Sequence, residues 1–186
     1  MGEPVISDKE IIEKLKTTGN NEEVFSLLAA KYQERLYWHI RKMVVSHDDT
    51  DDILQNTFLK VWKALDSFKG DSSFYTWIYR IATNETFTFL KIRDRQKSLS
   101  IDDGESSVIN SLKSDHNFDG NELQMRLQKY ILLLPAKQRL VFNMKYFDEM
   151  KYEDIAKITD NSIGALKASY HHAVKKLKAM FNDGSI

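Results

Sequence analysis

Apolar residues recur at three- and four-residue steps through most of this chain, and few residues interrupt them. The 186 residues include only two prolines, Pro4 and Pro135, and seven glycines. Proline and glycine are the residues that break helices most strongly, so such a chain favours long helices over many short strands. We therefore predict an all-α fold.

One stretch without helical periodicity divides the chain. Residues 98–120 read SLSIDDGESSVINSLKSDHNFDG and are rich in Ser, Asp, Asn and Gly, as flexible linkers are. Six acidic residues against one lysine make residues 98–124 acidic. We predict a helical domain over residues 1–96, a flexible acidic linker over 97–120 and a second helical domain over 121–186, both of ordinary size for small domains.

The first domain is expected to hold four helices. Ser7 and Glu10 form a capping-box pattern before the first, which ends at Gly19. A second helix should cover residues 21–45 and a third should start near Asp49. Its apolar side comprises Ile53, Leu54, Phe58, Val61, Trp62 and Leu65. After a loop over residues 67–73, a fourth helix should turn Ile78, Ile81, Ala82, Phe89 and Ile92 inward.

The second domain is also expected to hold four helices. Asn121 is placed to cap the first of these and Pro135 to open the next. Two helices over residues 152–158 and 162–180 are separated only by Thr159-Asp160-Asn161. Asp and Asn tolerate the left-handed conformation that a tight turn between helices often needs. This spacing is typical of a DNA-binding helix-turn-helix.

Several classes of function are excluded or disfavoured. The chain has no cysteine, which excludes disulfides, cysteine-ligated metals and thiol nucleophiles. The N-terminus lacks the pattern of a signal peptide, and no apolar run approaches the roughly 20 residues that cross a bilayer. We find no phosphate-binding loop, no nucleophile with a base and no metal cluster. The expectation is a soluble, cytoplasmic, non-catalytic protein without cofactor, metal or membrane insertion.

Two apparent metal patterns also fail. The aspartates at 48, 49, 51 and 52 lack the central glycine and closing glutamate of a calcium loop. His171 and His172 are neighbours on a predicted helix, so their side chains point about 100° apart and do not share one ion easily.

The formal net charge is zero, but the charge is unevenly distributed. Residues 161–181 carry four lysines and no acid, and residues 75–97 carry five basic residues against two acids. Both segments are predicted helices, which indicates contacts with phosphates. Solvated basic faces are the alternative. Residues 47–56 carry four aspartates and no basic residue other than His47.

The last predicted helix has distinct inner and outer faces. Ile163, Leu166, Tyr170, Ala173 and Leu177 recur at inward spacing. Small side chains on the outer face near its N-terminus would let the helix enter a major groove, and the lysines behind them would reach phosphates. The outer positions are Ser162, Gly164, Ala165, Lys167, Ala168, Ser169, His171, His172 and Lys175. A plain α-hairpin with a solvated basic face remains the alternative on spacing alone.

Three blocks of this chain resemble the extracytoplasmic-function (ECF) sigma factors of bacterial RNA polymerase, within the sigma-70 family. DTDDILQNTFLKVW from Asp49 is similar to their region 2.2, and FYTWIYRIATN from Phe74 to their regions 2.3 to 2.4. PAKQRLVF from Pro135, YEDIAKI from Tyr152 and SIGALKASYHHAVKKL from Ser162 resemble their region 4. The resemblance covers about residues 20–95 and 121–180, in the order of the family and with a linker between.

The resemblance implies a subunit that binds core RNA polymerase and recognises −10 and −35 promoter elements. Asp49, Asp52, Gln55, Asn56 and Phe58 would dock on the coiled coil of the largest polymerase subunit. Alternatively, one or two of the aspartates lie there only because the positive end of the helix dipole stabilises acidic side chains at a helix N-terminus. The polymerase flap and an anti-sigma factor, often a membrane protein in this family, are the other implied partners.

For the −10 element, the family implies a loop that holds a flipped base and a helix that follows it. Phe68, Lys69, Asp71 and Phe74 are the loop candidates, while Tyr75, Trp77 and Tyr79 are stacking candidates. Core packing is the alternative for Phe74 and Trp77. Asn84 is favoured for a base edge because an amide both donates and accepts. Arg80, Thr88, Lys91 and Arg93 would follow phosphates.

The implied −35 surface departs from the family pattern. Many members have Thr at position 165 and Arg at positions 169, 172 and 174, whereas this chain has Ala165, Ser169, His172 and Val174. It therefore offers fewer guanidinium groups for paired contacts with guanine. A free-standing transcriptional regulator is the rival interpretation, and it would bind promoter duplex tightly without polymerase.

Overall fold

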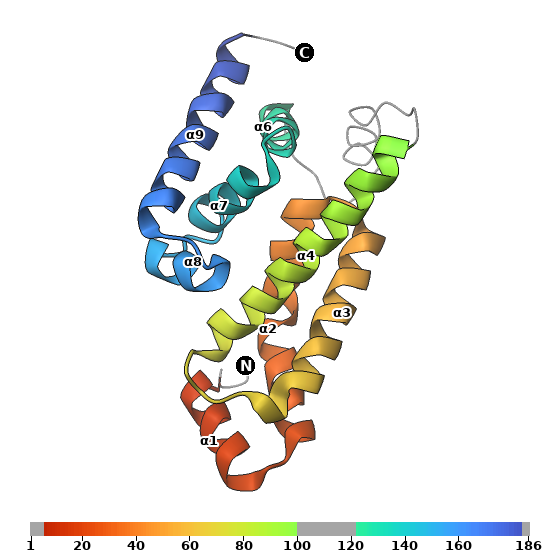
Figure 1. The fold of residues 1–186 in the computed structure, drawn as a ribbon, viewed down its shortest axis with the longest axis vertical. Coiled ribbons are helices and arrows are strands. Elements are labelled where there is room, and N and C mark those ends of the chain that lie inside the picture. Colours follow the sequence, from red (N-terminus) through yellow and green to blue (C-terminus); the bar gives the residue numbers. More distant parts are fainter. Residues whose placement is uncertain (1–5, 100–121, 184–186) are drawn as a thin grey trace.

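The computed structural model describes residues 6–99 and 122–183, and in these ranges every regular element is a helix (Figure 1). The elements are α1 (Asp8–Thr18), α2 (Asn21–Val44), α3 (His47–Ala64), the 3-10 helix η1 (Leu65–Ser67), α4 (Phe74–Leu99), α6 (Glu122–Leu132), α7 (Ala136–Tyr146), α8 (Tyr152–Thr159) and α9 (Ile163–Asn182). The predicted all-α fold is confirmed.

The predicted helix boundaries follow local hydrogen bonding. The Ser7 backbone N–H donates to Glu10 Oε2 at 2.7 Å, and the Glu10 N–H donates to Ser7 Oγ at 3.3 Å, which completes the capping box. Gly19 ends α1 with a left-handed φ of 59°. Asp160 ends α8 with a left-handed φ of 54°, and Ser162 Oγ then accepts from the Ala165 N–H at 3.2 Å. The turn and cap of the helix-turn-helix are therefore as expected.

Helices α1 to α4 form an N-terminal bundle, residues 6–99, in which α2, α3 and α4 pack against one another and α1 packs on α2 (Figure 1). The inward faces of α2, α3 and α4 meet in a core where Leu36, Ile40 and Ile78 have no exposed surface. Two of the buried threonines donate to carbonyls of their own helices: Thr57 Oγ1 to Ile53 and Thr86 Oγ1 to Ala82, both at 2.8 Å. Hydroxyls that are paired in this way are tolerated in an apolar core.

Helices α6 to α9 form a C-terminal bundle, residues 122–183, which has its own cluster of buried side chains. Tyr130, Ile131, Phe142, Ala173 and Leu177 pack together between α6, α7 and α9. The Phe181 ring meets the Tyr130 ring edge to face with centroids 4.8 Å apart.

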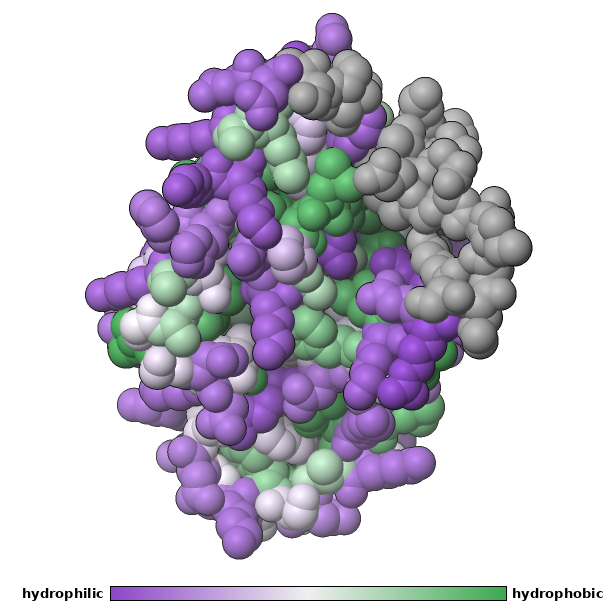
Figure 2. All heavy atoms as spheres, turned by 45° about the horizontal axis from the view of Figure 1, so that its top comes forward, coloured by the Kyte–Doolittle hydropathy of each residue, from purple (hydrophilic) through white to green (hydrophobic). Residues whose placement is uncertain are grey.

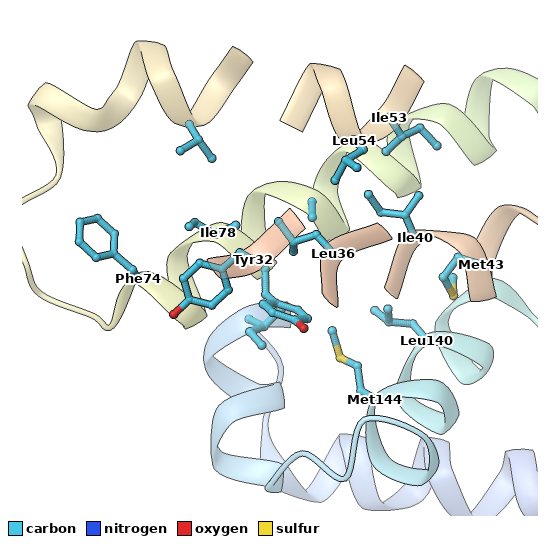
Figure 3. Close-up of a cluster of buried hydrophobic side chains, with 14 of the residues drawn as sticks. Tyr32, Leu36, Ile40, Met43, Ile53, Leu54, Phe74, Ile78, Leu140 and Met144 are labelled. Atoms are coloured by element: carbon cyan, nitrogen blue, oxygen red, sulfur yellow. The ribbon is translucent and has the colours of Figure 1, made fainter. Parts of the chain in front are cut away.

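The larger core crosses from one bundle to the other. Leu140 and Met144 of α7 are buried in the same cluster as Ile40 and Met43 of α2, and Leu140 lies beside Met43 in Figure 3. The bundles are therefore packed against each other. Of the predicted linker, residues 100–120 lie outside the described ranges, as does the expected cap Asn121; α4 continues to Leu99, past the predicted start at residue 97.

Two residues that periodicity assigns to inward faces are exposed instead. Ile92 is 50% exposed and Trp62 is 43% exposed. Those predictions were wrong because periodicity identifies the apolar side of a helix but not whether a neighbour covers it. Figure 2 accordingly shows hydrophobic residues in patches among hydrophilic ones on one face of the molecule. Among the described residues, no helix is both long and apolar enough to span a bilayer.

Candidate nucleic-acid interface

Four of the polar −10 candidates lie on one side of α4. Arg80, Asn84, Thr88 and Lys91 are spaced by four, four and three residues, which aligns them on a helix, and all four are exposed. We call them the α4 stripe. They alternate with Thr83 and Thr86, which are buried toward the bundle. The helix thus presents a line of donors and an amide on one face while its opposite face is held in the core.

The loop before α4 is held by aromatic packing. Phe74 is fully buried, and its ring stacks on Phe68 with centroids 4.2 Å apart and an angle of 18° between the planes. Trp77 closes the cluster at 4.9 Å from Phe68. This burial supports the interpretation that Phe74 packs in the core rather than contacts a base. Lys69 and Asp71, by contrast, are exposed on the same loop, on either side of Gly70 with its left-handed φ of 79°.

Tyr75 and Tyr79 pack inward rather than stand free. Their ring centroids are 4.5 Å apart, and Tyr75 also lies 6.4 Å from Tyr32. Burial raises the pKa of the Tyr75 hydroxyl to about 12. Tyr79 is only 4% exposed, so of these two tyrosines only the half-buried Tyr75 has surface to offer a base.

A residue that the sequence analysis missed anchors the start of α4. Asp8 Oδ2 accepts from the Tyr75 backbone N–H at 3.2 Å, while Asp8 Oδ1 accepts from Lys31 Nζ at 2.6 Å and from the Tyr32 hydroxyl at 2.5 Å. Unpaired N–H groups at a helix N-terminus favour such a carboxylate. The three partners are 23, 24 and 67 residues away along the chain, so no local pattern could have identified them.

Asp8 makes the stability of the N-terminal bundle depend on pH. Burial would raise its pKa, but the hydrogen bonds from Lys31, Tyr32 and Tyr75 outweigh burial and hold the pKa below the ordinary 3.8. A carboxyl with a lowered folded-state pKa stabilises the fold above its unfolded pKa, and that stabilisation is lost as the pH falls through the folded pKa.

We therefore expect Asp8→Asn to lower the free energy of unfolding at neutral pH, and the deficit to shrink below pH 3.8. Urea denaturation of both proteins across this range measures the difference. Glu13→Gln on the exposed side of α1 is the control. A deficit that is independent of pH would show that the carboxylate charge is not what stabilises the start of α4.

The −35 candidates lie on the exposed side of α9. Ser162, Gly164, Ala165, Lys167, Ala168, His171, His172 and Lys175 are exposed, and Ser169 is half-buried. Leu166, Ala173 and Leu177 are buried behind them. Lys167 Nζ of α9 lies 5.8 Å from the centre of the Tyr152 ring of α8, and this cation–π contact holds the lysine side chain against α8. No group of histidines and acids placed to hold a metal occurs within residues 6–99 and 122–183.

The candidates for polymerase binding are arranged along α3. Asp52, Gln55 and Asn56 are exposed on one side, whereas Asp49 is half-buried. Phe58 is half-buried as well and packs edge-on against Phe25 of α2 with centroids 5.9 Å apart.

Leu59 extends this exposed side of α3, with 55% of its surface free, and we call Asp52, Gln55, Asn56 and Leu59 the α3 stripe. Leu59 was not among the residues predicted from the sequence. An apolar residue flanked by acids and amides at helical spacing was the signal that could have identified it.

Family models match both bundles. Residues 28–96 match sigma-70 region 2, and residues 124–177 match sigma-70 region 4. The chain belongs to the sigma-70 family. This sigma factor is 31% identical over 176 residues to the ECF RNA polymerase sigma-E factors of Salmonella typhimurium and Escherichia coli K12, covering 90% of its own length and 91% of theirs. It is 27% identical to that of Haemophilus influenzae over 90% of its length and 92% of the relative.

These matches place the sigma factor in the ECF group, as the resemblance predicted. The match to region 2 decides against the free-standing regulator, because such a regulator needs only the helix-turn-helix. Solved structures with the same fold include the sigma factor RpoE in complex with the anti-sigma factor NepR from Bartonella quintana, with a TM-score of 0.68, 22% identity, and coverage of 85% of this chain and 96% of that one. CnrH in complex with the cytosolic domain of CnrY matches with a TM-score of 0.66 and 22% identity, covering 94% of this chain and 98% of that one.

Proposed function

We propose that this ECF sigma factor binds core RNA polymerase through the α3 stripe, reads the −10 element through the loop before α4 and the α4 stripe, and reads the −35 element through α9. The observation that carries the proposal is the alignment of Arg80, Asn84, Thr88 and Lys91 on one exposed side of a helix whose other side is buried. An amide among basic and hydroxyl groups suits a base edge flanked by phosphates. The protein itself would catalyse no reaction, and it would work in the cytoplasm.

We also propose that an anti-sigma factor controls this chain. The fold is shared with sigma factors that were solved with the anti-sigma factors NepR and CnrY. Exposed Leu123 and Leu133 of the C-terminal bundle, at 62% and 42%, provide apolar surface of the kind that a protein partner covers.

Reconstitution with core RNA polymerase on a library of genomic fragments tests the central proposal. We expect a small set of fragments to be transcribed from defined start sites only when the sigma factor is present. If no fragment is transcribed specifically, the proposed function is wrong.

Replacing Asn84 with alanine tests the −10 assignment. Loss of one base-edge contact should weaken discrimination at that position by about 1–3 kcal/mol, so initiation falls and substitution of the matching base pair is tolerated better. Initiation is measured on a promoter recovered from the library and on its single-base variants. Asn182→Ala at the exposed end of α9 is the matched control. A variant that initiates and discriminates like the wild type would remove Asn84 from the interface.

A further inference from the structure

Two neighbouring histidines lie in the middle of the exposed side of α9. His171 and His172 are both exposed, and their ring centroids are 6.0 Å apart. Among the described residues, neither imidazole has a hydrogen-bond or ion-pair partner. Packing of the helix does not need them, because Ala173 and Leu177 on its other side are buried. The ring nitrogens of both histidines are therefore available to a bound molecule.

The charged side chains that surround the two histidines on α9 itself are all cations. Lys167 and Lys175 lie one turn before and one turn after His171, and Lys176 lies one turn after His172. The helix contains no acidic residue. No carboxylate on α9 can therefore pair with either imidazole.

The three helices packed against α9, which are α6, α7 and α8, leave this situation unchanged. The charged side chains that they direct toward α9, or toward a ring that α9 also contacts, are Arg126 of α6 and Lys137 and Lys145 of α7. The acids of α8 are Glu153 and Asp154 in its first turn, and Asp160 ends that helix more than two turns before His171. Within the part of the chain that the structure describes, no carboxylate pairs with either histidine, and DNA would supply the missing negative charge.

The chemistry of histidine makes such a contact depend on pH. Histidine is the side chain that gains or loses its charge between about pH 5 and pH 8. The neutral ring has one donor nitrogen and one acceptor nitrogen, whereas the charged ring has two donors. Phosphate oxygens accept hydrogen bonds, and a phosphate next to the ring favours its charged form. DNA binding through these histidines therefore takes up protons.

Position 172 shows how this chain differs from its family. Many members have arginine there, and a guanidinium keeps its charge at any physiological pH. His172 puts in its place a side chain whose charge varies with pH, and His171 adds a second one. Because adjacent side chains on a helix point about 100° apart, the two rings can reach different groups of the same duplex.

We propose that His171 and His172 make the −35 contact proton-dependent. The charged imidazoles donate to phosphate oxygens at the −35 element, and the contact weakens as the pH rises and they lose their protons. The inference rests on the proposed function of α9 and adds a regulatory property to that surface. Promoters that depend on their −35 element are bound more tightly at lower pH, and promoters held mainly through the −10 element respond less.

The pH dependence is measured on the sigma factor in complex with core polymerase, with a promoter duplex recovered from the fragment library. Affinity is compared at about pH 6 and about pH 8, on either side of neutrality. We expect binding to be about tenfold tighter at the lower pH, because each proton taken up strengthens binding by at most tenfold per pH unit. The slope of log affinity against log salt should be steeper there by about 1–2, because each neutralised phosphate adds about 0.9.

Two double variants assign this dependence to the histidines. His171→Gln/His172→Gln keeps polar side chains that do not titrate, so its affinity should differ little between the two pH values. His171→Lys/His172→Lys carries permanent charges and should bind tightly at both. His47→Gln, at the exposed start of α3, is the matched control and should keep the wild-type response. Helix content by circular dichroism confirms that each variant is folded.

The inference is wrong if the glutamine variant keeps the full pH dependence, or if the lysine variant binds no more tightly than the wild type at about pH 8. A duplex with a scrambled −35 element locates the contact, and a response to the glutamine substitutions that persists on it would also contradict the inference. Failure of the inference leaves specific transcription in the reconstitution intact. Failure of the proposed function abolishes that transcription at every pH, in the wild type and in the lysine variant alike.

Discussion

Replacing Phe74 with alanine is expected to lower the free energy of unfolding of the N-terminal bundle by about 3–5 kcal/mol, the cost of removing a fully buried phenyl ring. The side chain has no exposed surface, stacks on Phe68 and lies 6.0 Å from Trp77. Its loss would leave a cavity under the loop that carries Lys69 and Asp71. Urea denaturation followed by circular dichroism measures the change.

Phe74→Leu is the matched control, since it keeps an apolar side chain of similar position and should cost much less than alanine. Promoter binding by each variant in complex with core polymerase, at a temperature where both variants are folded, is the second measurement. If Phe74→Ala is as stable as the wild type but binds promoter DNA poorly, the ring acts in recognition and its packing role is wrong.

Reversing the charge of Asp52 is expected to weaken binding to core polymerase by about 10- to 100-fold. An acidic face suits a basic coiled coil, so a lysine at this position would bring like charges together at the interface. Asp52 is exposed in the first half of α3, and the residues that hold α3 in the bundle, such as Ile53 and Leu54, are its buried neighbours. Asp52→Lys should therefore leave the fold intact. Titration of labelled sigma factor with core polymerase measures the affinity at two salt concentrations.

Glu13→Lys makes the same change in charge on α1 and is the control. We expect its affinity for core polymerase to match that of the wild type, and the deficit of Asp52→Lys to shrink as salt screens the repulsion. A deficit of equal size in both variants would mean that the polymerase senses net charge rather than the α3 stripe.

Much of the fold was predictable because its signals are local. Ser7 with Glu10, Gly19, and Asp160 before Ser162 each set a helix boundary through bonds within a few residues. The exposed side of α9 followed from the same periodicity that buries Leu166 and Leu177. Features of this kind depend only on residues that are close together in the sequence.

The features that sequence reasoning missed depend on distant partners. Asp8 binds a backbone group 67 residues away, and Asp148 binds Lys42 across 106 residues. No pattern within either segment indicates the other. The exposure of Ile92 and Trp62 has the same origin, since covering a helix face requires a neighbour whose position the periodicity does not contain.

The match to region 2 begins at residue 28, yet the carboxylate that holds the first turn of α4 comes from residue 8. A protein trimmed to the matched boundaries would keep every proposed DNA contact and lose the clamp on the helix that carries them. The −10 loop would lose the hydrogen bond that holds the helix after it. Weak promoter binding by such a fragment would then reflect the missing Asp8 rather than a poor match to the promoter. The folded unit that contains region 2 of this chain is thus longer than the residues that match the family model, and it starts at α1.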